Sequence, residues 1–465
     1  MHTKNSLYRT RNFATILATL IALAFWSCTP SWGEPARHEQ IWLAVSDVHL
    51  DAFARSATPS SYGFDTDRVL FESAAAQMGR VARDPSLVLL PGDFLMHNFA
   101  RNLRHDAGSP EKAAIRTMQL IAATLGRQYP NAQFAIALGN NDIPCGDYKS
   151  WGGSRYLAEL ARTWAHLVNR SGAAPGFAAS FARGGYYTAR LPVSGLRLIV
   201  LDTVLFSSRY RGSCDGGELA AASDELSWFS KTLRDTPLGV RNVVVMHIPP
   251  GFDAFTTDYL RGLLAWPFLQ RRYNDELVAA LREPRDRIAY AIAGHSHTFD
   301  VRLAGDVPVI LLSSLSPIYG NNPAFYTLRV MPDGSLRDID VYPFDLSTRA
   351  WLDYRSFDRT WSVNGVNAAS LGQLHARLAE TPRLRAIWDQ QANGWPTDSN
   401  GSNDPWGSNW RAAWCAQDLL ASDFAQCAGI DRKRRVLLIG GTVLLAAVVT
   451  SALAVVLRMR VAPRG

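Results

Sequence analysis

Five short apolar runs in this chain each end at a polar motif beside a Gly or Pro, and this pattern constrains the fold more than any other feature. The runs cover residues 41–45, 87–90, 134–138, 243–245 and 288–293. Their length and composition predict buried strands that stop at a turn. Because α/β proteins build their sites outside the carboxyl ends of strands, we expect the five motifs to meet at that edge.

The motifs carry side chains that bind divalent metal ions. Carboxylate and amide oxygens suit hard cations, and imidazole suits zinc, iron, nickel or copper. A single Gly-Asp turn or an isolated histidine is usually structural, but five such motifs in order, each after a strand, indicate a shared site. The seven candidate ligands are Asp47, His49, Asp93, Asn140, His247, His295 and His297.

The spacing of these ligands predicts two ions. Asp47 and His49 lie two residues apart, so both can reach one ion as the chain leaves the sheet. Asp93 follows the small Gly92 and can place one oxygen on each of two ions. Two divalent ions about 4 Å apart can generate a bridging hydroxide and hold a phosphate for in-line attack. We therefore expect a dinuclear site that binds zinc, with manganese or iron as alternatives.

Strand-like and helical segments alternate between residues 39 and 345, which predicts an α/β domain with helices covering its sheets. Further strands are expected at 186–191, 196–201, 307–312 and 325–330. Amphipathic helices are expected at 69–81, 113–125, 154–167, 220–233 and 274–281.

Residues 346–430 differ in character and predict a helical C-terminal subdomain packed on the α/β domain. Helical periodicity dominates at 370–391 and again at 409–420. The stretch 393–410 is rich in Gly, Asn, Ser, Pro and Trp, which is typical of a loop. We interpret the tryptophans of this region as core and subdomain contacts rather than as a ligand platform.

Both ends of the chain carry apolar segments. Residues 1–33 combine a basic start, an apolar stretch and small residues, which is typical of a secretory signal peptide, with an uncleaved anchor as the alternative. Residues 436–457 contain no charge and are long enough to cross a bilayer, and a short basic tail follows at 458–465. We expect a single-pass protein of the cell membrane whose body is periplasmic, or extracytoplasmic. Much of the net charge of +7 lies in these ends, so no specific nucleic-acid binding is expected.

Four cysteines remain when Cys28 is removed with the signal peptide. An even number in an exported chain indicates two disulfides, and the nearest-neighbour pairing joins Cys145 to Cys214 and Cys415 to Cys427. The other two connectivities stay open at this point. A zinc–thiolate site is not favoured, because the chain contains no Cys-x-x-Cys spacing.

The order of the motifs, Asp-x-His, Gly-Asp, Gly-Asn, His and Gly-His-x-His, resembles that of the calcineurin-like metallophosphoesterases. Three further details resemble the acid sphingomyelinase-like branch, which includes the endopolyphosphatases. They are Gly-Asp-Phe-Leu-Met-His at 92–97, His-Ile-Pro-Pro-Gly at 247–251, and the Ser-Pro and Asn-Pro pairs within 314–325. The resemblance covers about residues 40 to 345.

The resemblance implies a four-layer α/β/β/α sandwich, with two sheets between layers of helices. It also implies a place for each ligand. One ion would be held by Asp47, His49, Asp93 and His297, and the other by Asp93, Asn140, His247 and His295.

One position departs from the family pattern. The family usually has a histidine directly after Gly-Asn, which contacts the phosphate or protonates the leaving group. Here the residue is Asn141, which can hydrogen-bond a phosphate oxygen but cannot be a general acid near neutral pH. The endopolyphosphatases are similar in carrying Gly-Asn-Asn-Asp, so activity need not be lost. His97 is then the best remaining candidate for the acid.

These features predict a metal-dependent phosphoester hydrolase similar to the acid sphingomyelinase-like phosphodiesterases. The alternative is an endopolyphosphatase-like hydrolase of phosphoanhydrides, because such a leaving group needs no acid. A catalytically weak metal-binding protein is a third interpretation, which the presence of all seven ligand types disfavours. A lipid, a nucleotide and polyphosphate all stay open as substrates.

Overall fold

The computed structural model describes residues 38–216, 220–260, 263–282, 287–394, 410–418 and 423–430. The predicted signal peptide, membrane helix and basic tail lie outside these residues, as does most of the predicted loop at 393–410. None of the helices in the described residues has the length and apolar character needed to span a membrane.

The first sheet has seven strands, with β14-β13-β12-β1-β4-β5 in order and β15 paired to β13. Its strands β1, β4 and β5 are parallel, whereas β12 and β13 run antiparallel to their neighbours. Four of the predicted strands (41–45, 87–90, 134–138 and 325–330) are present in this sheet within about two residues of their expected ends. The bounds are β1 (Gln40–Ala44), β4 (Leu87–Leu90), β5 (Gln133–Ile136), β12 (Ala324–Val330), β13 (Leu336–Asp345), β14 (Ala350–Trp351) and β15 (Arg355–Ser356).

The second sheet has six strands in the order β10-β11-β9-β8-β7-β6, with a parallel centre and antiparallel edges. Successive side chains of β7 enter different cores: Leu198 and Val200 face the first sheet, and Ile199 faces the outer helices. Burial on both faces is typical of parallel strands. The bounds are β6 (Tyr187–Arg190), β7 (Leu196–Val200), β8 (Arg241–Val245), β9 (Ile288–Ala293), β10 (Asp300–Ala304) and β11 (Val307–Leu311).

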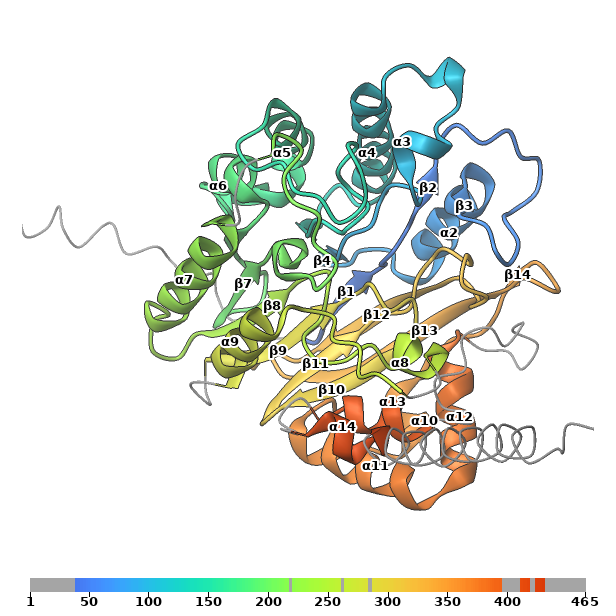
Figure 1. Ribbon diagram of the computed structural model, residues 1–465, viewed down its shortest axis with the longest axis vertical. Coiled ribbons are helices and arrows are strands. Elements are labelled where there is room, and N and C mark those ends of the chain that lie inside the picture. Colours follow the sequence, from blue (N-terminus) through green and yellow to red (C-terminus); the bar gives the residue numbers. More distant parts are fainter. Residues whose placement is uncertain are drawn as a thin grey trace, which may run out of the picture.

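Helices cover the outer face of each sheet, which gives the four layers that the family resemblance implied (Figure 1). The first sheet is covered by α2 (Arg68–Val81), α4 (Pro110–Gln128) and α5 (Arg155–Val168). The second is covered by α7 (Ala220–Arg234) and α9 (Arg271–Arg282). Shorter elements lie in the connections: β2 (Leu50–Asp51), β3 (Thr66–Asp67), α3 (Phe99–Asn102), α6 (Phe177–Gly184) and α8 (Ala254–Tyr259).

In the described residues, five helices follow the last strands and gather beside β10 and β13 (Figure 1). The predicted helix at 370–391 is two helices, because Pro382 lacks an N–H and starts a new helix after Thr381. Trp361 and Trp388 are fully buried with ring centroids 5.0 Å apart, so they are core contacts as expected. The bounds are α10 (Phe357–Trp361), α11 (Ala368–Glu380), α12 (Pro382–Ala392), α13 (Trp410–Ala416) and α14 (Phe424–Cys427).

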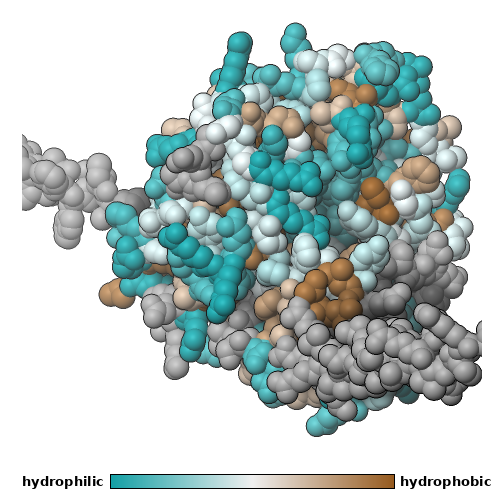
Figure 2. All heavy atoms as spheres, viewed as in Figure 1, coloured by the Kyte–Doolittle hydropathy of each residue, from teal (hydrophilic) through white to brown (hydrophobic). Residues whose placement is uncertain are grey.

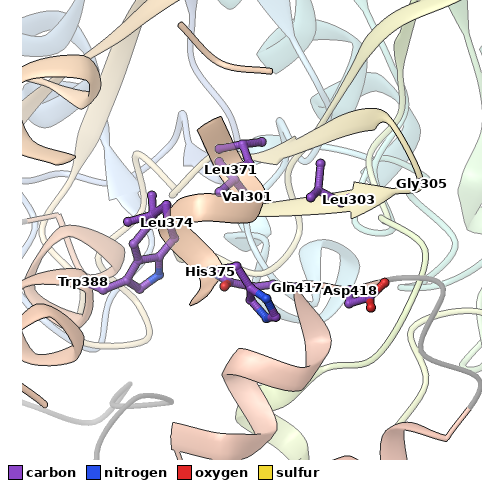
Figure 3. A pocket seen from close by; sticks show the side chains of 9 residues that line it. All are labelled: Val301, Leu303, Gly305, Leu371, Leu374, His375, Trp388, Gln417 and Asp418. Atoms are coloured by element: carbon purple, nitrogen blue, oxygen red, sulfur yellow. The ribbon is translucent and has the colours of Figure 1, made fainter. Parts of the chain in front are cut away.

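A pocket of about 220 Å³ lies between β10 and the helices α11, α12 and α13 (Figure 3). His375 lines it, and its imidazole stacks on Trp414 with ring centroids 4.3 Å apart. Its Nε2–H also donates to the carbonyl oxygen of Trp414 at 2.9 Å. His375 is thus a satisfied packing residue, and this pocket contains none of the candidate metal ligands.

Both nearest-neighbour disulfides are present, which confirms that pairing. Cys145–Cys214 spans 69 residues of sequence, and Cys415–Cys427 joins α13 to α14. Two disulfides indicate an oxidising compartment. The surface in Figure 2 is mainly hydrophilic or intermediate, with apolar side chains in small separate groups.

Candidate metal centre

The two sheets bring the carboxyl ends of five parallel strands to one place. Six of the seven candidate ligands are buried, and His295 is half-buried. Three sets of described side chains have ligand atoms within 4.8 Å of one another: Asp47 with His49 and Asp93, Asp93 with His247 and His295, and His49 with His97 and His297. The ligands follow their strands as expected: Asp47 and His49 after β1, Asp93 after β4, Asn140 after β5, His247 after β8, and His295 and His297 after β9.

Asp93 lies between imidazoles from different sheets. Its Oδ2 is 3.4 Å from Nε2 of His49 and 3.2 Å from Nε2 of His247. Asp47 Oδ1 lies 3.5 Å from Nε2 of His297, and Asn140 Oδ1 lies 3.2 Å from Nε2 of His247. The structure thus brings the predicted ligands together around one central carboxylate.

His49 and His247 present their Nε2 atoms to this centre. Nδ1–H of His49 donates to the carbonyl of Leu95 at 3.0 Å, and Nδ1–H of His247 donates to that of Pro91 at 2.8 Å. With the proton on Nδ1, the lone pair of Nε2 is directed inward, as in metal-binding histidines. Nε2 of His49 and Nε2 of His297 are only 3.1 Å apart.

Burial lowers the pKa of His49, His295 and His297 well below the ordinary value for histidine. For His247, burial lowers the pKa, but Asp93 and Asp47 outweigh it and raise the pKa to about 9, so a metal ion would have to displace that proton. Four imidazoles, two carboxylates and an amide oxygen form a donor set that fits divalent metal ions. The residues present therefore fit the metals that the calcineurin-like pattern implies.

Five of the candidate ligands have a left-handed backbone. Their φ angles are 49° for Asp47, 42° for His49, 57° for Asp93, 72° for His295 and 57° for His297. Such angles cost residues other than glycine on the order of 1 kcal/mol or more each. The surrounding chain imposes them: for example, the N–H of Asp47 donates to the carbonyl of Gly92 at 3.1 Å, and that of His49 to Asp93 at 2.9 Å.

Asp142 holds the Asp93 turn in place, a role that sequence reasoning did not identify. Its Oδ2 accepts from the N–H of Gly139 at 2.7 Å and of Asp93 at 3.0 Å, and its Oδ1 accepts from Phe94 at 2.7 Å. The close approach requires a glycine at 139, because a Cβ there would lie 2.1 Å from Oδ1 of Asp93. The last residue of Gly-Asn-Asn-Asp is therefore structural.

Asn141 lines the pocket above the metal centre. Its backbone N–H donates to Oδ1 of Asp93 at 2.7 Å, and its Oδ1 accepts from Asn140 Nδ2 at 2.6 Å. The buried Nδ2 of Asn141 has no well-formed hydrogen bond among the described residues, although the side chain lies near the carboxylate of Asp147, which lines the same pocket. This leaves one amide donor available at the place where sequence reasoning put a phosphate contact.

His97 stacks on His49 with ring centroids 3.9 Å apart. Its Nδ1–H donates to Oδ1 of Asp65 at 2.8 Å, and its backbone N–H donates to Oδ2 of Asp65, also at 2.8 Å. Burial lowers the pKa of His97, but the hydrogen bond and charge of Asp65 outweigh it, so the pKa lies above the usual value. Nε2 is 3.3 Å from the hydroxyl of Tyr319. His97 can therefore hold a proton at the pocket.

Sequence reasoning missed Asp65 because no motif surrounds it. It directly precedes β3, which pairs in parallel with β2 and so brings Asp65 beside the segment after β1. Tyr319 comes from the segment 314–325, which the sequence singled out only by its Ser-Pro and Asn-Pro pairs. Ser316 N–H donates to the carbonyl of Asp47 at 3.2 Å, which holds this segment against the metal centre.

A pocket of about 300 Å³ opens over the metal centre. Its walls include His97, Asn141, Tyr148, Arg209 and Tyr319. A pocket of this kind admits a phosphate group together with part of the group attached to it.

Comparison with known proteins shows to which family the chain belongs. The sequence profile of the calcineurin-like phosphoesterases matches residues 43–299. The chain is 27% identical over 354 residues to sphingomyelinase phosphodiesterase D of Dictyostelium discoideum, covering 72% of this chain and 75% of that protein. It is 24% identical over 312 residues to the cyclic GMP-AMP phosphodiesterase SMPDL3A of Bos taurus, covering 61% and 64%.

Among solved structures, a putative 5'-nucleotidase from Staphylococcus aureus is 16% identical with a TM-score of 0.37, covering 73% of this chain and 59% of that one. The names of the curated relatives agree with the acid sphingomyelinase-like branch that the motifs resemble. With its family profile matched across more than half of its length, the chain belongs to the calcineurin-like phosphoesterases and is a hydrolytic enzyme.

Proposed function

We propose that the protein is a phosphodiesterase that uses two divalent metal ions, with zinc as the preferred metal. The observation that carries this proposal is the position of Asp93, whose Oδ2 lies within 3.4 Å of imidazoles from both sheets. Two relatives named as phosphodiesterases support the reaction class. A carboxylate in this position can share its oxygens between two ions, and the remaining ligands lie on either side of it.

Different residues of the chain perform different steps of the proposed hydrolysis. Two ions held by these ligands would strengthen water as a nucleophile and offset the negative charge of the phosphate. The Nδ2 amide of Asn141, which has no well-formed hydrogen bond among the described residues, donates to a phosphate oxygen. As the new P–O bond forms and the bond to the leaving oxygen breaks, His97 gives its proton to that oxygen. Asp65 stabilises the charged imidazolium.

A substrate panel tests this function directly. The panel for the purified, zinc-loaded full-length protein contains bis-p-nitrophenyl phosphate, p-nitrophenyl phosphorylcholine, ATP and long-chain polyphosphate. We expect hydrolysis of the diesters and of ATP. Hydrolysis of polyphosphate alone would favour the endopolyphosphatase-like alternative, which Asn141 supports because it leaves the usual acid position without a titratable group. If the zinc-, manganese- and iron-loaded proteins hydrolyse none of these substrates, both the phosphodiesterase function and the endopolyphosphatase-like alternative are contradicted.

Asp65→Asn is expected to change the pH dependence of the enzyme. The acid must be protonated, so activity is lost as pH rises through the pKa of His97. Asp65 raises that pKa, and removing its charge therefore moves the loss of activity to lower pH. The pH profile of kcat/KM for an alkyl phosphodiester measures the shift.

The matched control for this change is Asp106→Asn, an exposed aspartate in the 3-10 turn after α3. It should leave the profile where it is in the unmodified protein. An Asp65→Asn profile that coincides with that of the control would show that Asp65 does not set the proton affinity of the acid.

We infer an architecture of a signal peptide at 1–33, a metallophosphoesterase domain at 39–345, a helical subdomain at 346–430 and a membrane helix at 436–457. The last segment would anchor the protein as a single-pass membrane protein with its catalytic domain in the periplasm. The charge-free apolar run and the two disulfides support this arrangement.

Removing residues 431–465 is expected to move the enzyme from the membrane fraction to the soluble fraction, because the apolar run is the proposed anchor. Quantitative fractionation of cells that express the two forms measures this. Removing only the basic tail at 458–465 is the control and should leave the protein in the membrane. A truncated enzyme that still sediments with membranes would contradict the proposed anchor.

A further inference from the structure

Arg209 lines the pocket without belonging to the predicted metal centre. Its guanidinium lies between two aromatic rings, with Cζ 5.9 Å from the ring centroid of Tyr148 and 5.5 Å from that of Trp266. Its Nη1 is 3.4 Å from the hydroxyl of Tyr148, and its Nη2 is 3.3 Å from that of Thr256. Because 41% of the side chain is exposed, the guanidinium is both held in place and open to the pocket.

The positive charge of Arg209 is only partly neutralised by a nearby carboxylate. Oδ2 of Asp253 lies 3.9 Å from Nη2, which is too far for a hydrogen bond. The oxygens of Asp253 instead accept from the N–H of Thr256 at 2.9 Å and from its hydroxyl at 2.5 Å. Among the described residues, Arg209 donates its hydrogen bonds to two hydroxyls, although a guanidinium has five N–H donors.

Arg209 is close to the predicted metal centre. The ring of Tyr148, on which the guanidinium lies, also packs edge-on against His295 with ring centroids 6.1 Å apart. Arg209 and His295 also line the same pocket. A substrate whose phosphate lies at the metal centre can therefore extend towards this cation.

The wall that carries Arg209 is fixed by covalent and hydrogen bonds. Cys145–Cys214 joins the segment before Tyr148 to the segment after Arg209. Between them, the N–H of Arg211 donates to the carbonyl of Tyr148 at 2.8 Å. A cation held on such a rigid wall is ordered before it meets a ligand, which favours specific binding.

We propose that Arg209 binds a second anionic group of the substrate while the reacting phosphate lies at the metal centre. The planar guanidinium matches the oxygens of a phosphate and can form two parallel hydrogen bonds with it. This inference rests on the proposed function and narrows its substrate class. It favours substrates with more than one phosphate, such as nucleoside polyphosphates, over phosphorylcholine esters, whose free end carries a positive charge.

Arg209→Ala in the zinc-loaded full-length protein tests the proposal. We expect kcat/KM for ATP to fall by ~10–100-fold, as for loss of a charge-assisted contact. The value for bis-p-nitrophenyl phosphate, which has one phosphate, should fall by less than ~3-fold, and that for p-nitrophenyl phosphorylcholine should stay equal or rise. Arg209→Lys should recover part of the ATP activity, because it keeps the charge but loses the planar fork.

Arg211→Ala is the matched control, because it removes the same charge from the same loop at an exposed position outside the pocket. In this control, the ranking of the three substrates by kcat/KM should be the same as in the unmodified protein. Equal losses on all three substrates in Arg209→Ala would overturn the proposal and make Arg209 a support of the metal centre.

Binding separates this inference from the proposed function. Calorimetric titration with tripolyphosphate and with inorganic phosphate does not require turnover. Arg209→Ala should weaken tripolyphosphate binding by ~10–100-fold and leave binding of inorganic phosphate unchanged. Unchanged tripolyphosphate binding would contradict the role of Arg209, whereas weakened binding in a protein that hydrolyses no diester would contradict only the phosphodiesterase function.

Discussion

Replacing Asp93 by asparagine is expected to remove most of the hydrolysis and to lower the bound metal from two ions towards one or none. Oδ2 of Asp93 lies 3.4 and 3.2 Å from imidazoles of different sheets, closer than Oδ1 of Asp47 at 3.9 and 3.5 Å, so the charge of Asp93 is the one that both ions would share. Losing several kcal/mol of metal-assisted stabilisation corresponds to a rate loss on the order of 10³-fold. Metal analysis of the dialysed protein and kcat/KM for bis-p-nitrophenyl phosphate measure the two effects.

Asp84→Asn makes the same chemical change at an exposed position between α2 and β4 and serves as the control. It should bind two ions and retain full activity. Circular dichroism of Asp93→Asn distinguishes a lost metal site from a lost fold. A folded Asp93→Asn protein with two bound ions and full activity would remove Asp93 from the metal centre.

Replacing His97 by alanine is expected to slow an alkyl phosphodiester by ~10²–10⁴-fold, the usual contribution of a general acid. His97 is hydrogen-bonded to Asp65 and directs Nε2 towards the pocket, so it can protonate the leaving oxygen. A p-nitrophenyl ester should be affected far less, because that leaving group departs without a proton. Comparing kcat/KM for the two esters in the same variant separates the loss of proton transfer to the leaving group from the loss of phosphate binding.

His105→Ala removes a histidine from an exposed turn of the same connection and should leave both esters unaffected. Equal losses on both esters in His97→Ala would show that His97 positions the phosphate rather than protonating the leaving group. The preferred substrate would then be a phosphoanhydride, which needs no acid.

The sequence predicted the strands that carry the metal ligands because each combines an apolar run with a motif at its end. The long strand β13 was not predicted, since charged residues and a proline interrupt its apolar pattern. One of these, Asp338, is fully buried and accepts hydrogen bonds from Ser356 Oγ at 2.6 Å and from the N–H of Asp358 at 2.8 Å. Such partners come from distant segments, so local pattern cannot reveal them.

The residues of the candidate site also fall into two groups, those that the sequence predicted and those that it did not. Its seven candidate metal ligands lie in recognisable motifs, and the structure brings all of them together. Asp65, Arg209 and Tyr319 come from connections without a motif, and only folding places them beside the pocket. The candidate metal ligands could therefore be located from the sequence, whereas the residues proposed to select the substrate or to tune a proton could not.

Because five candidate ligands have a left-handed backbone, the metal centre is preorganised for binding at a cost to the stability of the fold. The torsion angles that aim these side chains inward are imposed by the folded chain, so little rotational freedom is left to lose when an ion is captured. Glycine would relax the backbone at Asp47 or His295, but it has no side chain with which to bind a metal. Selection for a more stable protein and selection for a tighter metal site therefore act in opposite directions at the same few residues.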